Sequence, residues 1–239
     1  MGAGGRLGLM MPRTGRLHAG PSSFQDPGEV EATMGLYRDW CCPRLTALCM
    51  RNPQFLPYRR RALAEARGHV LELGAGAGAN LPYYPRAVTR VTAVEPSAWL
   101  IDRARARAAE LGLPLAPLQV GAEAIPLPDA SVDTVVSTWT LCSVDDLART
   151  LSEVRRVLRP GGHFLFVEHG LGPTPGLRRW QHRLNPVWRR LAGGCNLNRA
   201  VDRAVESSGL CLEGLETGFF PTGPRLLTYM YEGRARAAD

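Results

Sequence analysis

The amino-acid sequence predicts an α/β fold built on a doubly wound, mostly parallel sheet. Three observations predict it. A short apolar run at 70–73 breaks into a glycine-rich turn, as the first strand of such sheets does. Apolar strand patterns then alternate along the chain with amphipathic helix patterns. The length of 239 residues and the hydrophobic content of 45% suit one domain with a sizeable core.

The stretch Val70-Leu-Glu-Leu-Gly-Ala-Gly-Ala-Gly-Ala-Asn80 is the predicted ligand-binding turn. Its glycines, Gly74, Gly76 and Gly78, let the backbone turn tightly and let a ligand approach with no Cβ in the way. Their spacing is G-x-G-x-G, and the dinucleotide pattern G-x-G-x-x-G/A also fits if Ala79 takes the last position. The turn therefore predicts a nucleotide-like cofactor without identifying it. A short helical segment is expected from Asn80 on.

Two acidic residues accompany this turn. Glu72 lies two residues before the first glycine. A second strand at 90–95 ends in Glu95, about 20 residues further on, where a carboxylate can accept both hydroxyls of a ribose. Ser97 is then expected to cap a helix that runs to about Leu111. The apolar face of that helix is predicted to hold Ala104, Ala108 and Leu111.

The rest of the chain continues the pattern. Strands are predicted at 115–120, 132–138, 162–169, 210–217 and 225–233, and helices at 145–158 and 196–208. The strand at 132–138 is β-branched and expected to be buried, and the segment 138–144 at its carboxyl end should face the crevice where open α/β sheets bind ligands. The helix at 145–158 is predicted to bury Leu147, Leu151, Val154 and Leu158. It should end at Arg159-Pro-Gly-Gly162, because proline cannot continue a helix.

Three stretches resemble the motifs of class I S-adenosylmethionine-dependent methyltransferases: 72–78, 121–133 and 156–163. The resemblance covers about 68–233. It implies a Rossmann-like methyltransferase fold with a seven-stranded, mostly parallel sheet, an antiparallel last strand, a helical N-terminal cover and an insertion after strand five. It also implies S-adenosyl-L-methionine as the cofactor.

Three further pieces narrow the resemblance: 138–144, the spaced Trp180 and 184–188, and 194–199. Together they are similar to the methyltransferase-like-7 group, whose animal members are thiol S-methyltransferases, and to its bacterial relatives. The animal proteins begin with a hydrophobic membrane anchor that is not recognised in this sequence. This difference leaves both membrane residence and the transfer of a thiol substrate as open expectations.

The resemblance also implies roles for particular residues. The backbone from Gly74 to Gly78 should contact the methionine portion of the cofactor. Glu72 should contact the ammonium group of that portion, directly or through water. Glu95 should contact the ribose of the cofactor. Ala122 and Glu123 should contact the adenine, although Glu123 is otherwise an ordinary solvated loop acid. The full set of expected cofactor-binding residues is Glu72, Gly74, Ala75, Gly76, Gly78, Asn80, Glu95, Pro96, Ala122, Glu123 and Thr138.

The N-terminal region divides into two parts. Residues 1–33 are rich in Gly, Pro, Ser and Arg and are expected to be a disordered tail; we also expect Met34 to be the native start. Residues 34–239 form the expected methyltransferase domain, with N-terminal helices at 35–67, a cofactor-binding core at 68–169, an insertion at 170–195 and C-terminal elements at 196–235. The first helices should cover the cofactor and substrate, or form an interfacial membrane helix flanked by Arg38, Arg44 and Arg51.

The insertion at 170–195 interleaves arginines with Trp180 and Trp188. Such a pattern suits nucleic acid or an anionic membrane surface. The favoured interpretation is an amphipathic lid, with its tryptophans packed inward and its arginines solvated.

Methyl transfer from a sulfonium is an in-line displacement that needs no metal, so positioning and exclusion of water should dominate catalysis. A thiol or phenol acceptor must still lose a proton. His169, at the end of a strand, is the best-placed base, although it could equally be a hydrogen-bonded strand terminus. Cys142 is expected in the core rather than in the substrate pocket, and Asp133 is expected to be structural.

Composition limits the function further. The net charge is +7 and every basic residue is Arg, which excludes a lysine Schiff base. The high arginine content fits a GC-rich coding bias. The positive charge is therefore not evidence for nucleic-acid binding, and no nucleic-acid partner is expected. The six cysteines form no C-x-x-C pair and have no histidine at zinc-binding spacing, so no metal site is expected and the thiols should be reduced. No apolar run reaches the length of a membrane span. We expect a cytoplasmic protein, with peripheral contact to a membrane as the open alternative.

The sequence therefore predicts a methyltransferase that acts on a small or lipophilic nucleophile, with a thiol favoured. A lipid amine or a quinone ring is the alternative acceptor. A non-catalytic scaffold that binds S-adenosylmethionine and a nicotinamide oxidoreductase are the competing functions.

Overall fold

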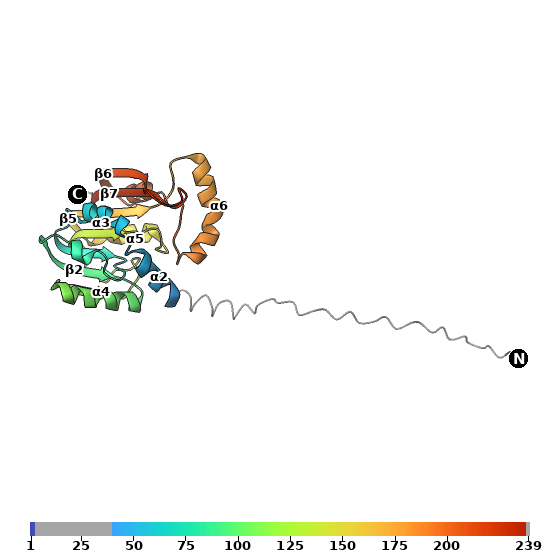
Figure 1. Ribbon diagram of the computed structural model, residues 1–239, viewed down its shortest axis with the longest axis horizontal. Helices are drawn as coiled ribbons and strands as arrows, with labels where there is room; N and C mark the ends of the chain where they lie inside the picture. Colours follow the sequence, from blue (N-terminus) through green and yellow to red (C-terminus); the bar gives the residue numbers. More distant parts are fainter. Residues whose placement is uncertain (3–39, 238–239) are drawn as a thin grey trace.

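The computed structural model describes residues 1–2 and 40–237, and the second of these ranges contains one seven-stranded sheet flanked by helices (Figure 1). The strands lie in the order β3-β2-β1-β4-β5-β7-β6. Neighbouring strands are parallel except at β7, which is antiparallel to both β5 and β6. The predicted mostly parallel sheet and its antiparallel last strand are confirmed. The predictions for residues 3–33, for Met34 and for Arg38 lie outside the described residues.

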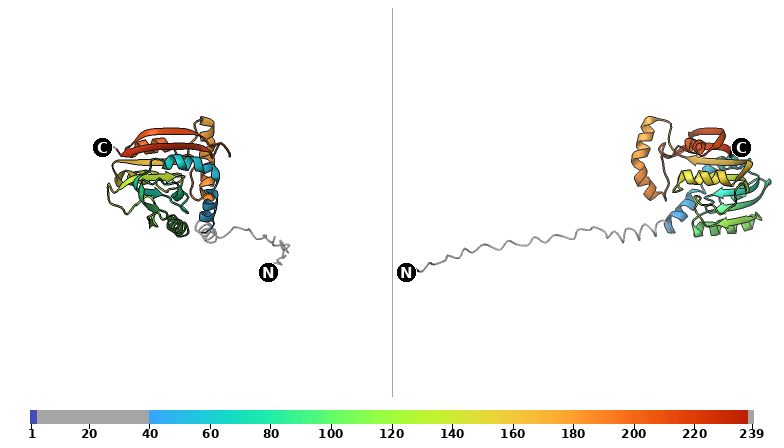
Figure 2. Two further views of the ribbon diagram at one scale, coloured as in Figure 1. Left: turned by 60° about the vertical axis from the view of Figure 1, so that its left-hand side comes forward. Right: turned by 180° about the vertical axis from the view of Figure 1, so that it is seen from behind.

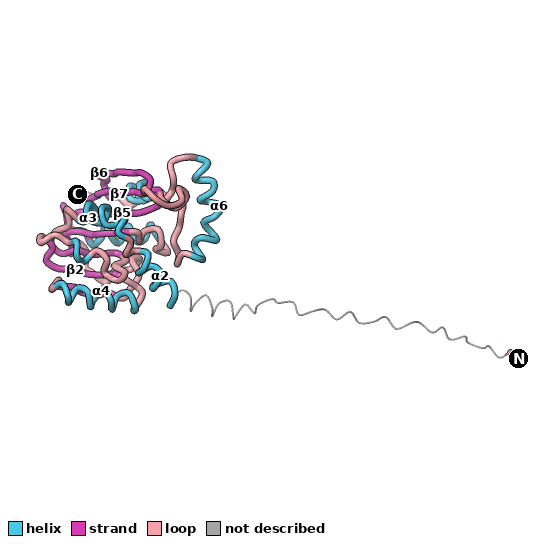
Figure 3. Tube along the Cα trace, viewed as in Figure 1, coloured by secondary structure: helices cyan, strands magenta, loops and turns pink. Residues whose placement is uncertain are grey.

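The strands are β1 (Gly68–Leu73), β2 (Val88–Val94), β3 (Leu115–Leu118), β4 (Val132–Thr138), β5 (Leu158–His169), β6 (Leu210–Phe219) and β7 (Tyr229–Ala237). The helices are α2 (Cys42–Cys49), α3 (Leu56–Leu63), α4 (Ala98–Leu111), α5 (Leu147–Val157), α6 (Pro175–Leu191) and α7 (Val201–Ser207), with short 3₁₀ turns at Pro53–Phe55 and Leu81–Tyr83. Figure 3 distinguishes the helices, strands and loops by colour.

Side chains alternate across β1, and this alternation explains why both faces of the sheet are covered. Val70 belongs to the apolar cluster that includes Leu63 of α3 and Ala108 of α4. Leu71 belongs to the opposite cluster, which includes Leu151 of α5 and residues of α7. Figures 1 and 2 show these helices from the two sides. Because β1, β2 and β4 are adjacent and parallel, their carboxyl ends meet at one edge.

Several element boundaries differ from the sequence predictions. Leu111 is 47% exposed, because α4 ends at Gly112, which adopts a φ of +63°, before another buried turn can form. Leu158 begins β5 instead of ending α5, since it pairs with Val132 of β4. The strand expected at 225–233 begins only at Tyr229. Ser97 caps α4 as predicted, by accepting a hydrogen bond from the Leu100 amide.

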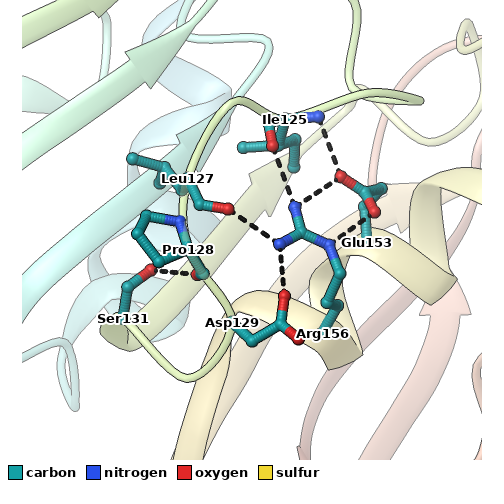
Figure 4. Close-up of polar contacts among 7 residues, drawn as sticks. All are labelled: Ile125, Leu127, Pro128, Asp129, Ser131, Glu153 and Arg156. Atoms are coloured by element: carbon teal, nitrogen blue, oxygen red, sulfur yellow. Dashed lines mark hydrogen bonds and ion pairs between the residues drawn. The ribbon is translucent and has the colours of Figure 1, made fainter.

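Arg156 on α5 fixes the loop that precedes β4 (Figure 4). Its guanidinium donates to the carbonyl oxygens of Ile125 at 2.9 Å and Leu127 at 2.7 Å. It also pairs with Asp129 at 2.7 Å and with Glu153 at 2.7 Å. Hydrogen bonds to Glu153 and Asp129 raise the pKa of Arg156, so the anchor is charged at all physiological pH values. This loop directly follows Ala122 and Glu123, and the contacts of Arg156 hold it in a fixed position.

Helix α6 forms the insertion and stands apart at one end of the sheet (Figure 1). Gln181 is fully buried and ties the helix to the core, because its side chain bonds Gly172 N, Gly170 O and Leu226 O. Trp188 is half-buried on the same side, as predicted. Trp180 is 55% exposed, so its predicted inward packing is wrong. It shares an outward stripe with residues four, seven and eleven positions later, namely Leu184, Val187 and Leu191. Among the described helices, none is long and apolar enough to cross a membrane.

Candidate functional site

A cleft of ≈ 1680 Å³ opens at the carboxyl ends of β1, β2 and β4. The glycine-rich turn forms its floor, and residues of α2 and of the C-terminal end of α6 form the facing wall. Gly193, which follows α6, lies against Cys42 of α2, since a Cβ built there would sit 2.3 Å from the Cys42 sulfur. The cleft is therefore the crevice that the sequence predicts for this edge of the sheet.

The glycine turn has the backbone shape that its spacing predicts. Gly74 adopts a φ of +59°, and a Cβ there would lie 2.3 Å from Thr140 Oγ1. Gly76 adopts a φ of +55°, yet a Cβ there would meet only the Gly74 carbonyl oxygen, at 3.9 Å. Packing therefore requires glycine at Gly74, whereas Gly76 presents bare backbone to the open cleft. A ligand can approach this backbone closely.

Glu95 lies at the end of β2, beside the turn. One carboxylate oxygen accepts the Gly76 amide at 3.0 Å and the other accepts the Ser97 amide at 2.9 Å. Burial raises the pKa of Glu95, although these two amides oppose the rise. Each carboxylate oxygen can accept a further hydrogen bond, and Glu95 and Pro96 both line the cleft. Such a fixed carboxylate is suited to accept a pair of ligand hydroxyls.

Glu72 is the centre of a buried polar network at the end of β1. It accepts hydrogen bonds from Asn80 Nδ2 and from the Tyr84 hydroxyl, each at 2.8 Å. Asn80 Nδ2 also donates to Thr138 Oγ1 at 3.0 Å. Burial raises the pKa of Glu72 to about 7, despite the opposing hydrogen bonds of Tyr84 and Asn80 and the charge of Arg59. A cation bound beside Glu72 would favour its charged form.

Arg59 completes this network and was not predicted from the sequence. It is only 4% exposed. Its Nη1 donates to Asn80 Oδ1 at 2.5 Å and lies 3.4 Å from Thr138 Oγ1, and its guanidinium lies 5.0 Å from the ring centre of Trp139. Burial lowers the pKa of Arg59 from its ordinary value.

The arginine run at 59–61 looks like a solvated helix face, which is why Arg59 escaped prediction. A signal was nevertheless present. The residues three, four and seven positions after Arg59 are apolar or small, and all are buried in the structure: Ala62, Leu63 and Ala66. This helical spacing places Arg59 on the inward face of α3, while Arg60 is exposed.

Ala122 and Glu123 lie on the far side of the cleft, after β3. Ala122 is buried, and both residues line the cleft with Gly121. Glu123 Oε1 accepts the Asp145 amide at 2.8 Å. Glu123, for which the sequence also allows a solvated loop position, is therefore hydrogen-bonded to the segment that leads into α5. It lies within reach of a ligand in the cleft.

The remaining predicted residues lie elsewhere. Cys142 is 3% exposed, in agreement with a core position. Asp133 has a structural setting, because it accepts the His69 amide at 2.8 Å and pairs with Arg159 at 2.6 Å. His169 does not belong to the described cleft lining. Its Nε2 lies 3.0 Å from Cys195 Sγ, so its role as a base stays a prediction.

Part of the cleft lining is less polar. Helix α2 and the residue that follows it contribute a set of small or apolar side chains: Cys42, Pro43, Thr46, Ala47 and Met50. Trp139 also lines the cleft, with a strained φ of +52° and its ring centre 4.7 Å from that of Phe55. The cleft lining thus combines polar groups, which suit a charged nucleoside, with small and apolar side chains, which suit a lipophilic molecule, and it also includes arginines such as Arg51 and Arg189.

Comparison with known proteins agrees with this geometry. A family model for a methyltransferase domain matches residues 71–166. The human thiol S-methyltransferase TMT1A is 40% identical over 141 residues, which cover 57% of each chain. The human thiol S-methyltransferase TMT1B is 34% identical over 178 residues, which cover 70% of this chain and 72% of the relative. The match therefore spans little more than half of TMT1A and most of TMT1B.

Solved structures share the fold. Geranyl diphosphate C-methyltransferase from Streptomyces coelicolor A3(2), solved with Mg²⁺, geranyl diphosphate and S-adenosyl-L-homocysteine, is similar with a TM-score of 0.59 at 17% identity over 76% of each chain. The open glycine backbone and the buried carboxylates fit an adenosyl cofactor that carries an ammonium group. The chain belongs to the S-adenosylmethionine-dependent methyltransferases of class I, in the family that contains the thiol S-methyltransferases TMT1A and TMT1B.

Proposed function

We propose that this methyltransferase transfers the methyl group to a small, lipophilic thiol. The observation that carries the proposal is the mixed lining of the cleft, which combines the polar network around Glu72 with small and apolar side chains of α2. The similarity of this chain to the human thiol S-methyltransferases TMT1A and TMT1B supports the same class of acceptor.

The polar groups of the cleft would hold the cofactor by complementary charge. Glu72, supported by Asn80, would face the ammonium of the methionine portion, and Arg59 would face its carboxylate. Glu95 would accept the ribose hydroxyls. Backbone from Gly74 to Gly78, with Ala75, would lie along the methionine portion beside Thr138, and Ala122, Glu123 and Pro96 would border the adenosine.

When bound, the cofactor supplies a methyl group on a sulfonium, and its transfer leaves a neutral thioether. The protein therefore needs chiefly to hold the acceptor in line and to exclude water. Helix α2 and the segment after α6 close over the cleft and suit this task. A thiol acceptor must also lose its proton. His169 stays only a predicted base for that step, because it does not belong to the described cleft lining.

A product assay tests the acceptor class. Purified protein is incubated with S-adenosyl-L-methionine and, in turn, an alkyl thiol, phosphatidylethanolamine or a demethylated quinone precursor, and S-adenosylhomocysteine is followed by mass spectrometry. We expect turnover with the thiol. Turnover confined to the lipid or the quinone would overturn the thiol assignment. Cofactor binding without turnover on any acceptor would favour the scaffold function.

A further inference from the structure

Three soft ligand groups meet behind the wall of the cleft, although they are far apart in the sequence. Cys142 follows β4, His169 ends β5, and Cys195 follows α6. Their ligand atoms, the two sulfurs and one imidazole nitrogen, all lie within 4.8 Å of one another. The adjacency of β4 and β5 brings the first two to one edge of the sheet, and the return of the chain after α6 brings the third.

We infer that Cys142, His169 and Cys195 form a binding site for one thiophilic divalent metal ion, with Zn²⁺ as the expected occupant. Thiolate and imidazole ligands in a set of three suit zinc, with a fourth position left for water or another ligand. The inference concerns a separate cluster and does not depend on which acceptor the enzyme methylates.

The surroundings hold the three groups in place. The Asn196 backbone and side-chain amides both donate to the Cys142 carbonyl oxygen, at 2.8 and 2.9 Å. Arg199 donates to the carbonyl oxygens of Leu141 and Val144, on either side of Cys142. The loops that carry the two cysteines are therefore joined through their backbones, as a preorganised ligand set requires.

The hydrogen bonds to Cys195 point in the same direction. Trp188 Nε1, which can only donate, lies 3.3 Å from Cys195 Sγ. A sulfur that accepts an N–H in a half-buried setting is the arrangement that outer groups give to a metal-bound thiolate. Cys195 is not fully buried, so an ion can reach the cluster.

The distance between His169 and Cys195 needs only a small adjustment. A tetrahedral zinc ion with sulfur at about 2.3 Å and nitrogen at about 2.0 Å places those two atoms about 3.5 Å apart. His169 Nε2 and Cys195 Sγ are 3.0 Å apart, so an entering ion has to separate them by about half an ångström. On binding, both cysteine thiols release their protons to solvent, and the two thiolates neutralise the charge of the ion. A metal-bound His169 could not act as a base, so metal binding here would rule out the predicted catalytic role of this residue.

Cobalt binding tests the inference without reference to activity. The full-length protein is reduced, stripped with a chelator, transferred to chelator-free buffer and titrated with Co²⁺. We expect one Co²⁺ per chain, with the strong absorption of thiolate-to-cobalt charge transfer, and its loss when an equimolar amount of Zn²⁺ is added. Absence of that absorption from protein with all its thiols reduced would overturn the inference. If Cys142 and Cys195 are first found joined in a disulfide, the protein is titrated again after that bond is reduced. Failure of the reduced protein to bind Co²⁺ would overturn the inference equally.

Variants locate the site. Loss of a group that only contacts a metal ligand typically weakens metal binding by roughly 10–100-fold. Trp188→Phe should weaken Co²⁺ binding by an amount within that range. Cys195→Ser and His169→Ala, which remove ligands themselves, should weaken Co²⁺ binding by more. Cys211→Ser is the matched control, since Cys211 is an exposed free cysteine on β6. Binding of S-adenosylhomocysteine checks that each variant is folded. Equal Co²⁺ affinity in Cys195→Ser and Cys211→Ser would contradict the assignment.

Discussion

Glu72 gives the cleft its clearest pH dependence. Burial raises its pKa to about 7, and an ammonium group bound beside the carboxylate would lower it, because the charged form would then be favoured. The bound state therefore holds fewer protons below pH 7, and affinity for S-adenosylhomocysteine should rise with pH, by at most about tenfold per unit. Above about pH 7 this contribution should level off.

Calorimetry at pH 6, 7 and 8 measures this effect. Glu72→Gln cannot titrate and should show weaker binding with a flatter pH profile. A wild-type affinity that falls between pH 6 and 7, or a variant that keeps the wild-type slope, would show that Glu72 does not face the ammonium.

Glu95→Ala should weaken cofactor binding strongly. The change removes a carboxylate that would accept ribose hydroxyls and that also fixes the Gly76 amide at 3.0 Å. Hydrogen bonds to a charged group are each worth about 1.5–3 kcal/mol, so we expect a loss of roughly 10–100-fold or more. Asp102→Ala on the exposed face of α4 is the control. An unchanged dissociation constant by calorimetry would remove Glu95 from the site.

Arg59→Met tests the residue that the sequence did not reveal. The methionine keeps much of the side-chain volume but removes the charge that would face the cofactor carboxylate, so S-adenosylhomocysteine affinity should fall by roughly 10–100-fold. Arg60→Met is the matched control, because Arg60 is the exposed neighbour on the same helix. Similar affinities for the two variants, with both folded by circular dichroism, would assign Arg59 a structural role alone.

At the scale of elements, the loop between β3 and β4 depends on Arg156. The guanidinium bonds two loop carbonyls and Asp129 as well as Glu153 (Figure 4). Arg156→Leu leaves these partners without a donor and should lower the free energy of unfolding by about 2 kcal/mol. Hydrogen bonds to charged groups contribute more to stability than those between neutral groups. For a domain of this size the midpoint of thermal unfolding should drop by about 4–8 °C.

A scanning calorimetry comparison with Arg105→Leu checks this prediction. Arg105 pairs with Asp102 on the surface, where both side chains are more than half exposed, so its loss should change stability by less than about 1 kcal/mol. If Arg156→Leu and Arg105→Leu unfold at the same temperature, Arg156 does not anchor the loop.

At the scale of the whole molecule, local sequence patterns predict the sheet and the polar floor of the cleft. The strand at 132–138 is found at its predicted bounds. Glu72, Glu95 and Thr138 lie at the ends of adjacent parallel strands, so their meeting follows from strand order.

Other features depend on tertiary contacts that no local pattern encodes. Trp180 faces outward because buried Gln181 takes the inward position on α6. Arg59 is buried because α3 docks at the end of the glycine turn, where Asn80 accepts its hydrogen bond. Cys142 and Cys195 meet only when the chain returns after α6, a contact that sequence spacing cannot reveal.

The most direct test of the central claim uses a donor labelled in its methyl group. The protein is incubated with S-adenosyl-L-methionine carrying a trideuterated methyl group and an alkyl thiol, and the thioether product is analysed by mass spectrometry. We predict a thioether that carries the intact label, formed with an equal amount of S-adenosylhomocysteine and nearly abolished in Glu95→Ala. Unlabelled thioether, or no thioether from protein that binds the cofactor, would contradict methyl transfer to a thiol in this cleft.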